Sequence, residues 1–210
     1  MAKISPSLLA ADPACLGDAA RLALRTGCDE LHFDVMDGRF VPNLTFGPHI
    51  LRGLARQVPF WYDVHLMLQN PLAFVEAFAQ AGAGAITVHA EAEAFAQSLR
   101  AIRGLGLKAG ASLRPGTPAR CLLENLPLID RVLLMTVEPG FGGQKLMPQV
   151  LDKARTLREM GFAGEIAADG GINALNASEV VEAGVGVLIM GTAFFGAQDA
   201  AGVVRLVHAL

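Results

Sequence analysis

Short apolar runs and amphipathic stretches alternate along the whole chain. The apolar runs are six to eight residues long and rich in Val, Ile, Leu and Ala. Runs of this length, bounded by turn-forming residues, are typical of strands that are buried on both faces. The eight predicted strands span residues 2–9, 30–36, 60–67, 84–90, 108–113, 131–137, 164–171 and 185–191.

The stretches between the runs have apolar residues three or four positions apart, which is the spacing of an amphipathic helix. Most of them close with glycine, the residue that best tolerates the left-handed conformation at a helix end. We expect helices over residues 16–27, 71–83, 95–106, 147–161, 176–185 and 199–210, with Gly27, Gly82, Gly106, Gly161 and Gly184 as the closing glycines.

Strand and helix in regular alternation predict an α/β fold whose strands are parallel and joined by right-handed crossovers. Eight such units in 210 residues match a compact (β/α)8 TIM barrel, a single domain over residues 1–210. An open doubly wound sheet is the alternative, because periodicity does not show whether a sheet closes. No Gly-x-Gly-x-x-Gly follows the first strand, however, and no linker or low-complexity segment divides the chain.

Histidines and carboxylates interrupt two of these apolar strands. Side chains alternate along a strand, so His32 and Asp34 lie on the same face of the second strand. His65 lies in the third strand, and Asp169 lies near the end of the seventh. Active sites of such barrels lie at the carboxyl ends of the strands, where we expect these four residues to converge. Two imidazoles and two carboxylates suit a divalent metal ion, whose charge the carboxylates balance.

Each of these residues taken singly has an ordinary structural explanation, as a core histidine or as the cap of a following helix. Their shared faces and strand ends together favour a site. Asp37 is out of phase and is followed by Gly38, so we expect it to cap or orient a loop. His89 has no carboxylate on its own face nearby, and we expect it to support the core rather than to bind the metal.

Glycine-rich segments follow the last three strands: "VEPGFGGQK" at 137–145, "DGG" at 169–171 and "MGTAFFG" at 190–196. Glycines let backbone N–H groups turn toward an anion without interference from Cβ atoms. Barrels commonly bind phosphate with these loops. The sequence therefore predicts a phosphorylated ligand; Lys145 is expected to be a solvated surface lysine.

Composition narrows the remaining possibilities. The chain is 52% apolar, yet no run of about 18 uncharged apolar residues could span a bilayer. Its net charge is −3 and it has one Trp and one Tyr, so it lacks the basic, aromatic-rich composition typical of a nucleic-acid-binding protein. A small ligand is therefore expected. Residues 1–12 lack the pattern of a secretory signal. Three widely spaced cysteines suggest neither disulfides nor a thiolate metal site, and a reducing cytoplasm is the expected location.

With these residues established, the sequence resembles the ribulose-phosphate 3-epimerase family from end to end. The most specific matching segments are "HFDVMDGRFVPNLTFGP" and "MTVEPGFGGQK". Shorter ones are "ISPSLLAAD", "DVHLM", "AGAGAITVHAE", "PGTP", "DGGIN" and "MGTAFFG". Departures are small: Ala168 and Thr192 stand where many members carry Val and Ser, and the C-terminal tail is short.

The resemblance implies a barrel enzyme that interconverts D-ribulose 5-phosphate and D-xylulose 5-phosphate in the pentose phosphate pathway. It implies a divalent metal ion held by His32, Asp34, His65 and Asp169, with Asp34 and Asp169 also acting as the acid/base pair. The residues that it implies for substrate binding are Ser7, His65, Met36, Met67 and Met135 around the reacting centre, and Gly140, Phe141, Gly142, Gly143, Gly170, Gly171, Gly191 and Thr192 around the phosphate.

Two carboxyl groups suit an epimerisation next to a ketone, because a proton must leave one face of the carbon and return to the other. Two alternatives stay open: a 3-epimerase of a hexulose phosphate such as allulose 6-phosphate, and a non-catalytic phosphosugar-binding barrel. The ligand set accepts Zn²⁺, Fe²⁺, Mn²⁺ or Co²⁺. The family implies a homo-oligomer, either a dimer or a hexamer.

Overall fold

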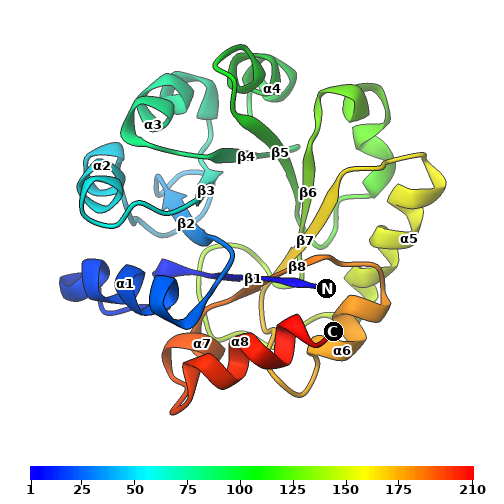
Figure 1. The fold of residues 1–210 in the computed structure, drawn as a ribbon. Helices are drawn as coiled ribbons and strands as arrows, with labels where there is room; N and C mark the ends of the chain where they lie inside the picture. Colours follow the sequence, from blue (N-terminus) through cyan, green and yellow to red (C-terminus); the bar gives the residue numbers. More distant parts are fainter.

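Eight parallel strands form a ring at the centre of the protein in the computed structural model, which describes residues 1–210 (Figure 1). Each lies within one of the predicted runs, which are thereby confirmed. The strands are β1 (Lys3–Pro6), β2 (Leu31–Met36), β3 (Tyr62–Met67), β4 (Ala85–His89), β5 (Lys108–Leu113), β6 (Arg131–Met135), β7 (Glu165–Asp169) and β8 (Val187–Met190).

The strand order decides between the two predicted architectures. It runs β1-β8-β7-β6-β5-β4-β3-β2, and every neighbouring pair is parallel. The first and last members of this order approach each other at an isolated parallel bridge between Ser7 and His32. A doubly wound sheet would instead reverse its order at an internal switch point. The (β/α)8 TIM barrel is therefore confirmed, nearly closed at this bridge.

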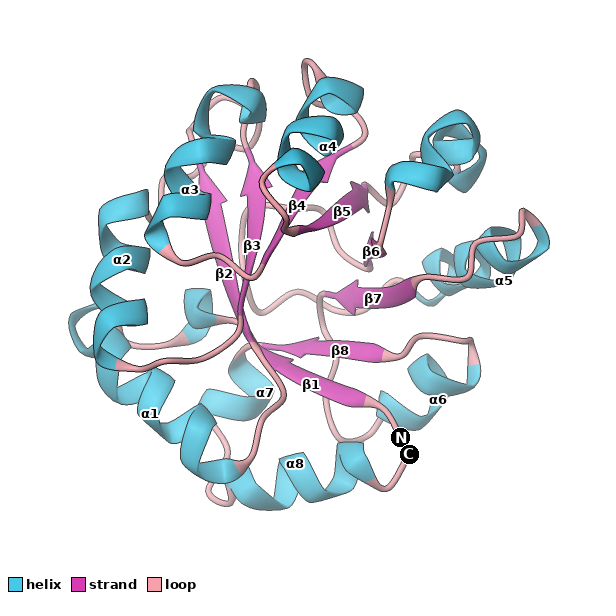
Figure 2. Cartoon of the chain, turned by 45° about the horizontal axis from the view of Figure 1, so that its top comes forward, coloured by secondary structure: helices cyan, strands magenta, loops and turns pink.

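Helices surround the ring of strands on its outside (Figure 2). Because the strands are parallel, each connection must return to the opposite end of the barrel, and a helix packed on the outer face does so. The α-helices are α1 (Leu16–Thr26), α2 (Pro48–Gln57), α3 (Val75–Ala81), α4 (Phe95–Gly104), α5 (Asp152–Glu159), α6 (Ala177–Glu182), α7 (Thr192–Phe195) and α8 (Ala200–His208). The 3-10 helices are η1 (Leu8–Ala10), η2 (Pro13–Cys15), η3 (Pro71–Phe74), η4 (Ala119–Leu128) and η5 (Pro148–Leu151).

The helices differ from the predicted ones in detail. The segments 71–83 and 147–161 each begin with a 3-10 turn that opens on a proline, and only then continue as α3 and α5. The prediction omitted α2, α7 and the 3-10 segments η1, η2 and η4. All five predicted closing glycines have positive φ, but only Gly27 and Gly82 directly cap their helices. The other three lie two residues past the helix end.

The two faces of the barrel wall bury different side chains. Outward-facing residues such as Ile4, Phe33 and Val64 join the main apolar core under the helices. The interior is divided: β6, β7 and β8 contribute an apolar cluster above the buried Arg131 at the start of β6, whereas β1 to β5 and the residue after β1 contribute mostly buried polar side chains. The apolar cluster contains Leu133, Met135, Ala167, Val187 and Ile189, and the buried polar side chains include Ser5, Ser7, His32, Asp34, Asp63, His65, Thr87, His89 and Ser112.

Gly110 of β5 shows how tightly the polar half is packed. A Cβ atom there would overlap the Thr87 hydroxyl on the neighbouring strand. The missing side chain therefore leaves room for the polar groups that the strands bring together.

Candidate active site

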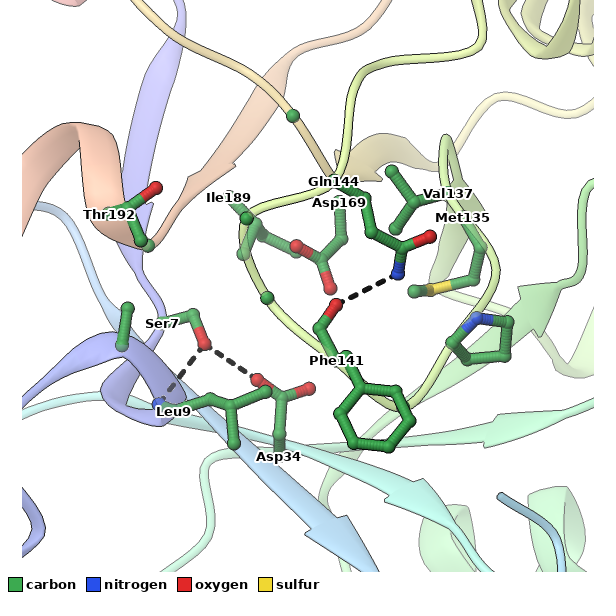
Figure 3. A pocket seen from close by; sticks show the side chains of 18 of the residues that line it. Ser7, Leu9, Asp34, Met135, Val137, Phe141, Gln144, Asp169, Ile189 and Thr192 are labelled. Atoms are coloured by element: carbon green, nitrogen blue, oxygen red, sulfur yellow. Dashed lines mark hydrogen bonds between the residues drawn. The ribbon is translucent and has the colours of Figure 1, made fainter. Parts of the chain in front are cut away.

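A cavity of about 310 Å³ opens at the carboxyl ends of the strands, where the βα loops gather (Figure 3). Asp34, two residues before the end of β2, and Asp169, the last residue of β7, both line it. Their strands are three positions apart around the ring. Figure 3 shows both carboxyl groups turned toward the same space.

The predicted substrate residues gather at this cavity, with one exception. The exception is His65. It is wholly buried and, like the predicted metal ligand His32, does not line the cavity. The roles of all these residues stay predictions. Those that line the cavity are Ser7, Asp34, Met36, Met67, Met135, Gly140, Phe141, Gly142, Gly143, Asp169, Gly170, Gly171, Gly191 and Thr192.

The four predicted metal ligands form one compact group. His32 Nε2 and His65 Nδ1 lie 3.2 Å and 3.1 Å from the same oxygen, Asp34 Oδ1, and His32 Nε2 lies 4.0 Å from Asp169 Oδ2. One ligand atom from each residue falls within 4.8 Å of the others. The parallel register explains part of this geometry, because it pairs Asp34 directly with His65.

These residues fit a divalent cation. The Nε2 atom of His32 is buried and has no hydrogen-bond partner, which is costly for a polar atom unless something binds it. Two nitrogen and two oxygen donors suit Zn²⁺ and related first-row ions. Burial alone would lower the pKa of His32, but the carboxylates of Asp34 and Asp63 outweigh it and hold that pKa well above its usual range. The site therefore favours positive charge.

The two carboxyl groups differ sharply in acidity. Burial alone would raise the pKa of Asp34, but His32 and His65 outweigh it and hold that pKa well below its usual range. Burial, together with the charge of Asp34, raises the pKa of Asp169 to about 7. The pair can therefore present one carboxylate and one carboxylic acid near neutral pH, as proton removal and proton return require.

Ser7 fixes the remaining oxygen of Asp34. Its hydroxyl donates a 2.6 Å hydrogen bond to Asp34 Oδ2 and accepts one from the Leu9 backbone N–H (Figure 3). The carboxylate of Asp34 is thereby held in one orientation, with Oδ1 toward the two imidazoles and Oδ2 toward Ser7.

Glycines of the loops after β6, β7 and β8 also line the cavity. Gly171 has a φ of 69°, and a Cβ there would overlap the Leu146 backbone nitrogen in the loop after β6. The loops after β6 and β7 thus touch backbone to backbone, which only glycine permits. Exposed N–H groups in such loops are suited to an anion.

Side chains outside the predicted site hold these loops. Asn43 Nδ2 donates to the Gly140 carbonyl at 2.8 Å, and Gln144 Nε2 donates to the carbonyls of Glu138 and Phe141. Asp37 accepts from the backbone N–H groups of Arg39, Phe40 and Gln69, which confirms its predicted role in orienting a loop. Asn43 and Gln144 were missed, although both lie within segments that the sequence analysis quoted.

Two buried residues next to the histidines were also overlooked or only partly anticipated. Asp63 bonds His32, and His89 bonds His65 at 2.9 Å, in agreement with the supporting role expected for His89. The expectation that His89 has no carboxylate nearby is wrong, because Glu91 Oε2 lies 3.2 Å from His89 Nδ1. The signal for Asp63 was its parity: it lies on the same strand face as His65. Apolar cavity residues such as Leu9, Ile172 and Ile189 carried no signal that distinguished them from core residues.

No helix in this structure combines the length and the apolar character needed to cross a membrane.

Comparison with known proteins places this geometry in context. Residues 3–195 match the Ribulose-phosphate 3 epimerase family. A Ribulose-phosphate 3-epimerase of Mycobacterium bovis is 47% identical over 206 residues, which cover 96% of this chain and 89% of that protein. The Ribulose-phosphate 3-epimerase, cytoplasmic isoform, of Oryza sativa subsp. japonica is 41% identical, with coverages of 94% and 89%.

More distant solved structures share the architecture. The 3-keto-L-gulonate-6-phosphate decarboxylase from Vibrio cholerae superposes with a TM-score of 0.75 at 17% identity, over 100% of this chain and 97% of its own. At that identity the likeness shows the fold alone. The two epimerases, in contrast, are more than 40% identical to this chain over nearly its whole length. Together with the family match over residues 3–195, these identities show that the chain is an epimerase and belongs to the ribulose-phosphate 3 epimerase family.

Proposed function

We propose that the protein inverts C3 of a phosphorylated ketose, interconverting D-ribulose 5-phosphate and D-xylulose 5-phosphate, with Asp34 and Asp169 as its acid/base pair. One observation carries the proposal: two carboxyl groups of opposite protonation preference face one cavity from separate strands. Family membership supports the same reaction and argues against a non-catalytic barrel.

In the forward step the Asp34 carboxylate removes the C3 proton from one face, and the electron pair moves toward the neighbouring carbonyl to give an enediolate. The Asp169 carboxylic acid then returns a proton to C3 from the other face. Asp34 is left protonated and Asp169 ionised, so the same pair is poised for the reverse reaction. Exchange of protons with solvent restores the starting charge states.

His32, Asp34, His65 and Asp169 would hold a divalent ion, which we propose to be Zn²⁺, Fe²⁺, Mn²⁺ or Co²⁺. Bound there, the ion would supply Lewis-acid stabilisation for the negative charge that develops on the substrate oxygens. The donor set and the unpartnered His32 Nε2 support this assignment.

Met36, Met67 and Met135 supply a polarizable, apolar lining beside the two carboxyl groups. Such a lining excludes water that could protonate a planar intermediate on either face. We assign the phosphate to the glycine loops at 140–143, 170–171 and 191–192, with Phe141 at the exposed edge. Binding energy from the phosphate would hold C3 between the two acids.

The remaining assignments follow from the family. Residues 1–210 would act as one catalytic unit in the cytoplasm, as the name of the rice relative supports, and would take a small phosphorylated ketose in the pentose phosphate pathway. We infer a homo-oligomer; light scattering coupled to size-exclusion chromatography distinguishes a monomer, a dimer and a hexamer.

Coupled assays test the reaction directly. We expect a kcat/KM for ribulose 5-phosphate far above that for allulose 6-phosphate; the reverse preference would assign the protein to the hexulose phosphate. Metal analysis of the same sample identifies the ion, and chelation should abolish activity until metal is restored. Incubation of ribulose 5-phosphate in deuterated water should label C3, and an unlabelled C3 with metal present would reject the proposed chemistry.

A further inference from the structure

His32 has a fixed hydrogen-bond partner on the side away from the cavity. Its Nδ1 lies 3.0 Å from Asp63 Oδ2, and both side chains are wholly buried. An ionised carboxylate only accepts hydrogen bonds, so the proton must be on Nδ1. In the neutral ring that can bind a metal, the lone pair is then on Nε2, the atom that lies among the other candidate ligands without a hydrogen-bond partner.

Asp63 is itself held from two other sides. Arg131 Nη1 lies 3.1 Å from Asp63 Oδ2, and the Thr87 hydroxyl donates to Asp63 Oδ1 at 3.3 Å. Arg131 is anchored in turn by a bidentate pair with Glu30, at 2.6 Å and 2.8 Å. A carboxylate with this many partners keeps its position and stays available to the imidazole.

The second histidine is supported differently. His65 Nε2 faces His89 Nε2 at 2.9 Å, and His89 Nδ1 lies 3.2 Å from Glu91 Oε2. With Nδ1 of His65 directed at the site, its Nε2 must donate to His89. His65 is therefore oriented by a neutral imidazole, whereas His32 contacts a carboxylate directly.

We propose that Asp63 is the positioning residue of the metal site: it fixes the tautomer and ring orientation of His32 and so sets the affinity for a divalent cation. The inference rests on the proposed function, because it assumes that His32 is a ligand. A carboxylate behind a ligating imidazole makes the ligand nitrogen more basic, and loss of such a partner typically weakens metal binding by about 10- to 100-fold. Asp63 does not line the cavity.

The test compares Asp63→Asn with Glu165→Gln in the full-length protein. Glu165 bonds Arg131 at 2.8 Å from the far side of the guanidinium and is not among the partners of His32. Each variant removes one carboxylate that contacts Arg131. Glu165→Gln therefore shows how much affinity is lost when the ion pairs of Arg131 are disturbed without a change at His32. Competition with a chelating indicator measures affinity for Zn²⁺, and circular dichroism and melting confirm the fold.

We expect Asp63→Asn to bind Zn²⁺ about 10- to 100-fold more weakly than wild type, and Glu165→Gln to stay within about twofold. Equal losses in the two variants would show a merely structural network and overturn the inference, as would unchanged affinity in Asp63→Asn. If wild type binds none of Zn²⁺, Fe²⁺, Mn²⁺ and Co²⁺ but epimerises normally, the metal site of the proposed function fails as well.

A second readout does not depend on the variant folding. The long-range ¹H–¹⁵N spectrum of the Zn²⁺-loaded wild-type protein should show His32 protonated at Nδ1 and deprotonated at Nε2. A His32 that is protonated at Nε2, or that lacks a proton on Nδ1, would overturn the role of Asp63 whatever the affinities are.

Discussion

Asp34 and Asp169 reach one cavity from strands three positions apart, and the negative charge of the first helps to raise the pKa of the second to about 7. The two side chains are thus coupled through space although 134 residues separate them in sequence, between positions 34 and 169. One of them is expected to accept a proton while the other is ready to donate one. The first prediction follows from this division of roles.

Replacing either acid should stop epimerisation without stopping all chemistry at C3. We expect Asp169→Asn and Asp34→Asn each to lower kcat by about 10²- to 10⁴-fold, the usual contribution of a positioned acid or base. The surviving carboxylate can still remove and return a proton on its own face. Each variant should therefore exchange the C3 proton of one epimer with deuterated solvent while forming little of the other.

Metal content must be measured alongside these rates, since both residues are proposed ligands. The two-acid mechanism would be wrong if one variant, with metal bound, kept more than a tenth of the wild-type kcat. It would also be wrong if both variants labelled the same epimer.

Asn43 should matter for substrate affinity although it lies in a loop after β2. Its side chain donates to the Gly140 carbonyl and so connects that loop to the proposed phosphate loop. A net hydrogen bond is worth about 0.5–1.5 kcal/mol, so Asn43→Ala should raise KM by about 2- to 13-fold with little change in kcat. Steady-state kinetics on ribulose 5-phosphate give both values.

Leu44→Ala is the matched control, because Leu44 follows directly in the chain and is largely exposed. It should leave KM unchanged. Chymotrypsin offers an independent readout, since Phe141 is exposed in the same phosphate loop and should be cleaved faster in Asn43→Ala. An unchanged KM and an unchanged cleavage rate would together contradict the connection.

Gly110 and Gly53 should respond oppositely to alanine. Gly110→Ala places a methyl group against Thr87 inside the barrel and should lower the free energy of unfolding by about 1–3 kcal/mol, the cost of overpacking. Gly53 lies within α2 with nothing near its Cβ position, so alanine there should raise that free energy by up to about 1 kcal/mol. Urea unfolding of both variants checks the signs; a stabilising Gly110→Ala would refute the packing argument.

Glu165 should make stability depend on acid pH. Burial alone would raise its pKa, but Lys3 and Arg131 outweigh burial and lower it to about 2. A carboxyl group whose pKa is lower in the folded state stabilises the protein above its unfolded pKa, near 4.5, and loses that contribution as pH falls toward about 2.

Glu165→Gln should accordingly be less stable than wild type at pH 7, with a difference that shrinks as pH falls below about 4.5. Urea midpoints of the two proteins at pH 7, 5 and 4 measure the difference. A gap that stays constant or widens on acidification would contradict the assigned stabilisation.

The sequence by itself determined the eight strands, because runs buried on both faces leave an apolar signature that no loop or amphipathic helix shares. It also determined which face His32, Asp34 and His65 occupy, since alternation along a strand is local geometry. The same rule puts Asp63 on the strand face of His65, but a shared face does not separate a metal ligand from a residue that supports one. The sequence did not separate the 3-10 turns that begin at Pro71 and Pro148 from the α-helices that follow them, because 3-10 and α turns have similar apolar spacing.

Only the tertiary structure decided how these local features meet. Closure of the ring at Ser7 and His32, and the approach of Asp169 to Asp34, depend on the stagger between strands, which is set by packing around the whole barrel. The acidity difference between the two carboxyl groups likewise arises from burial and from neighbours far apart in sequence. Periodicity depends only on residues that are neighbours in the sequence. The distance between Asp34 and Asp169, and the electrostatic effect of one on the other, arise only when the chain has folded.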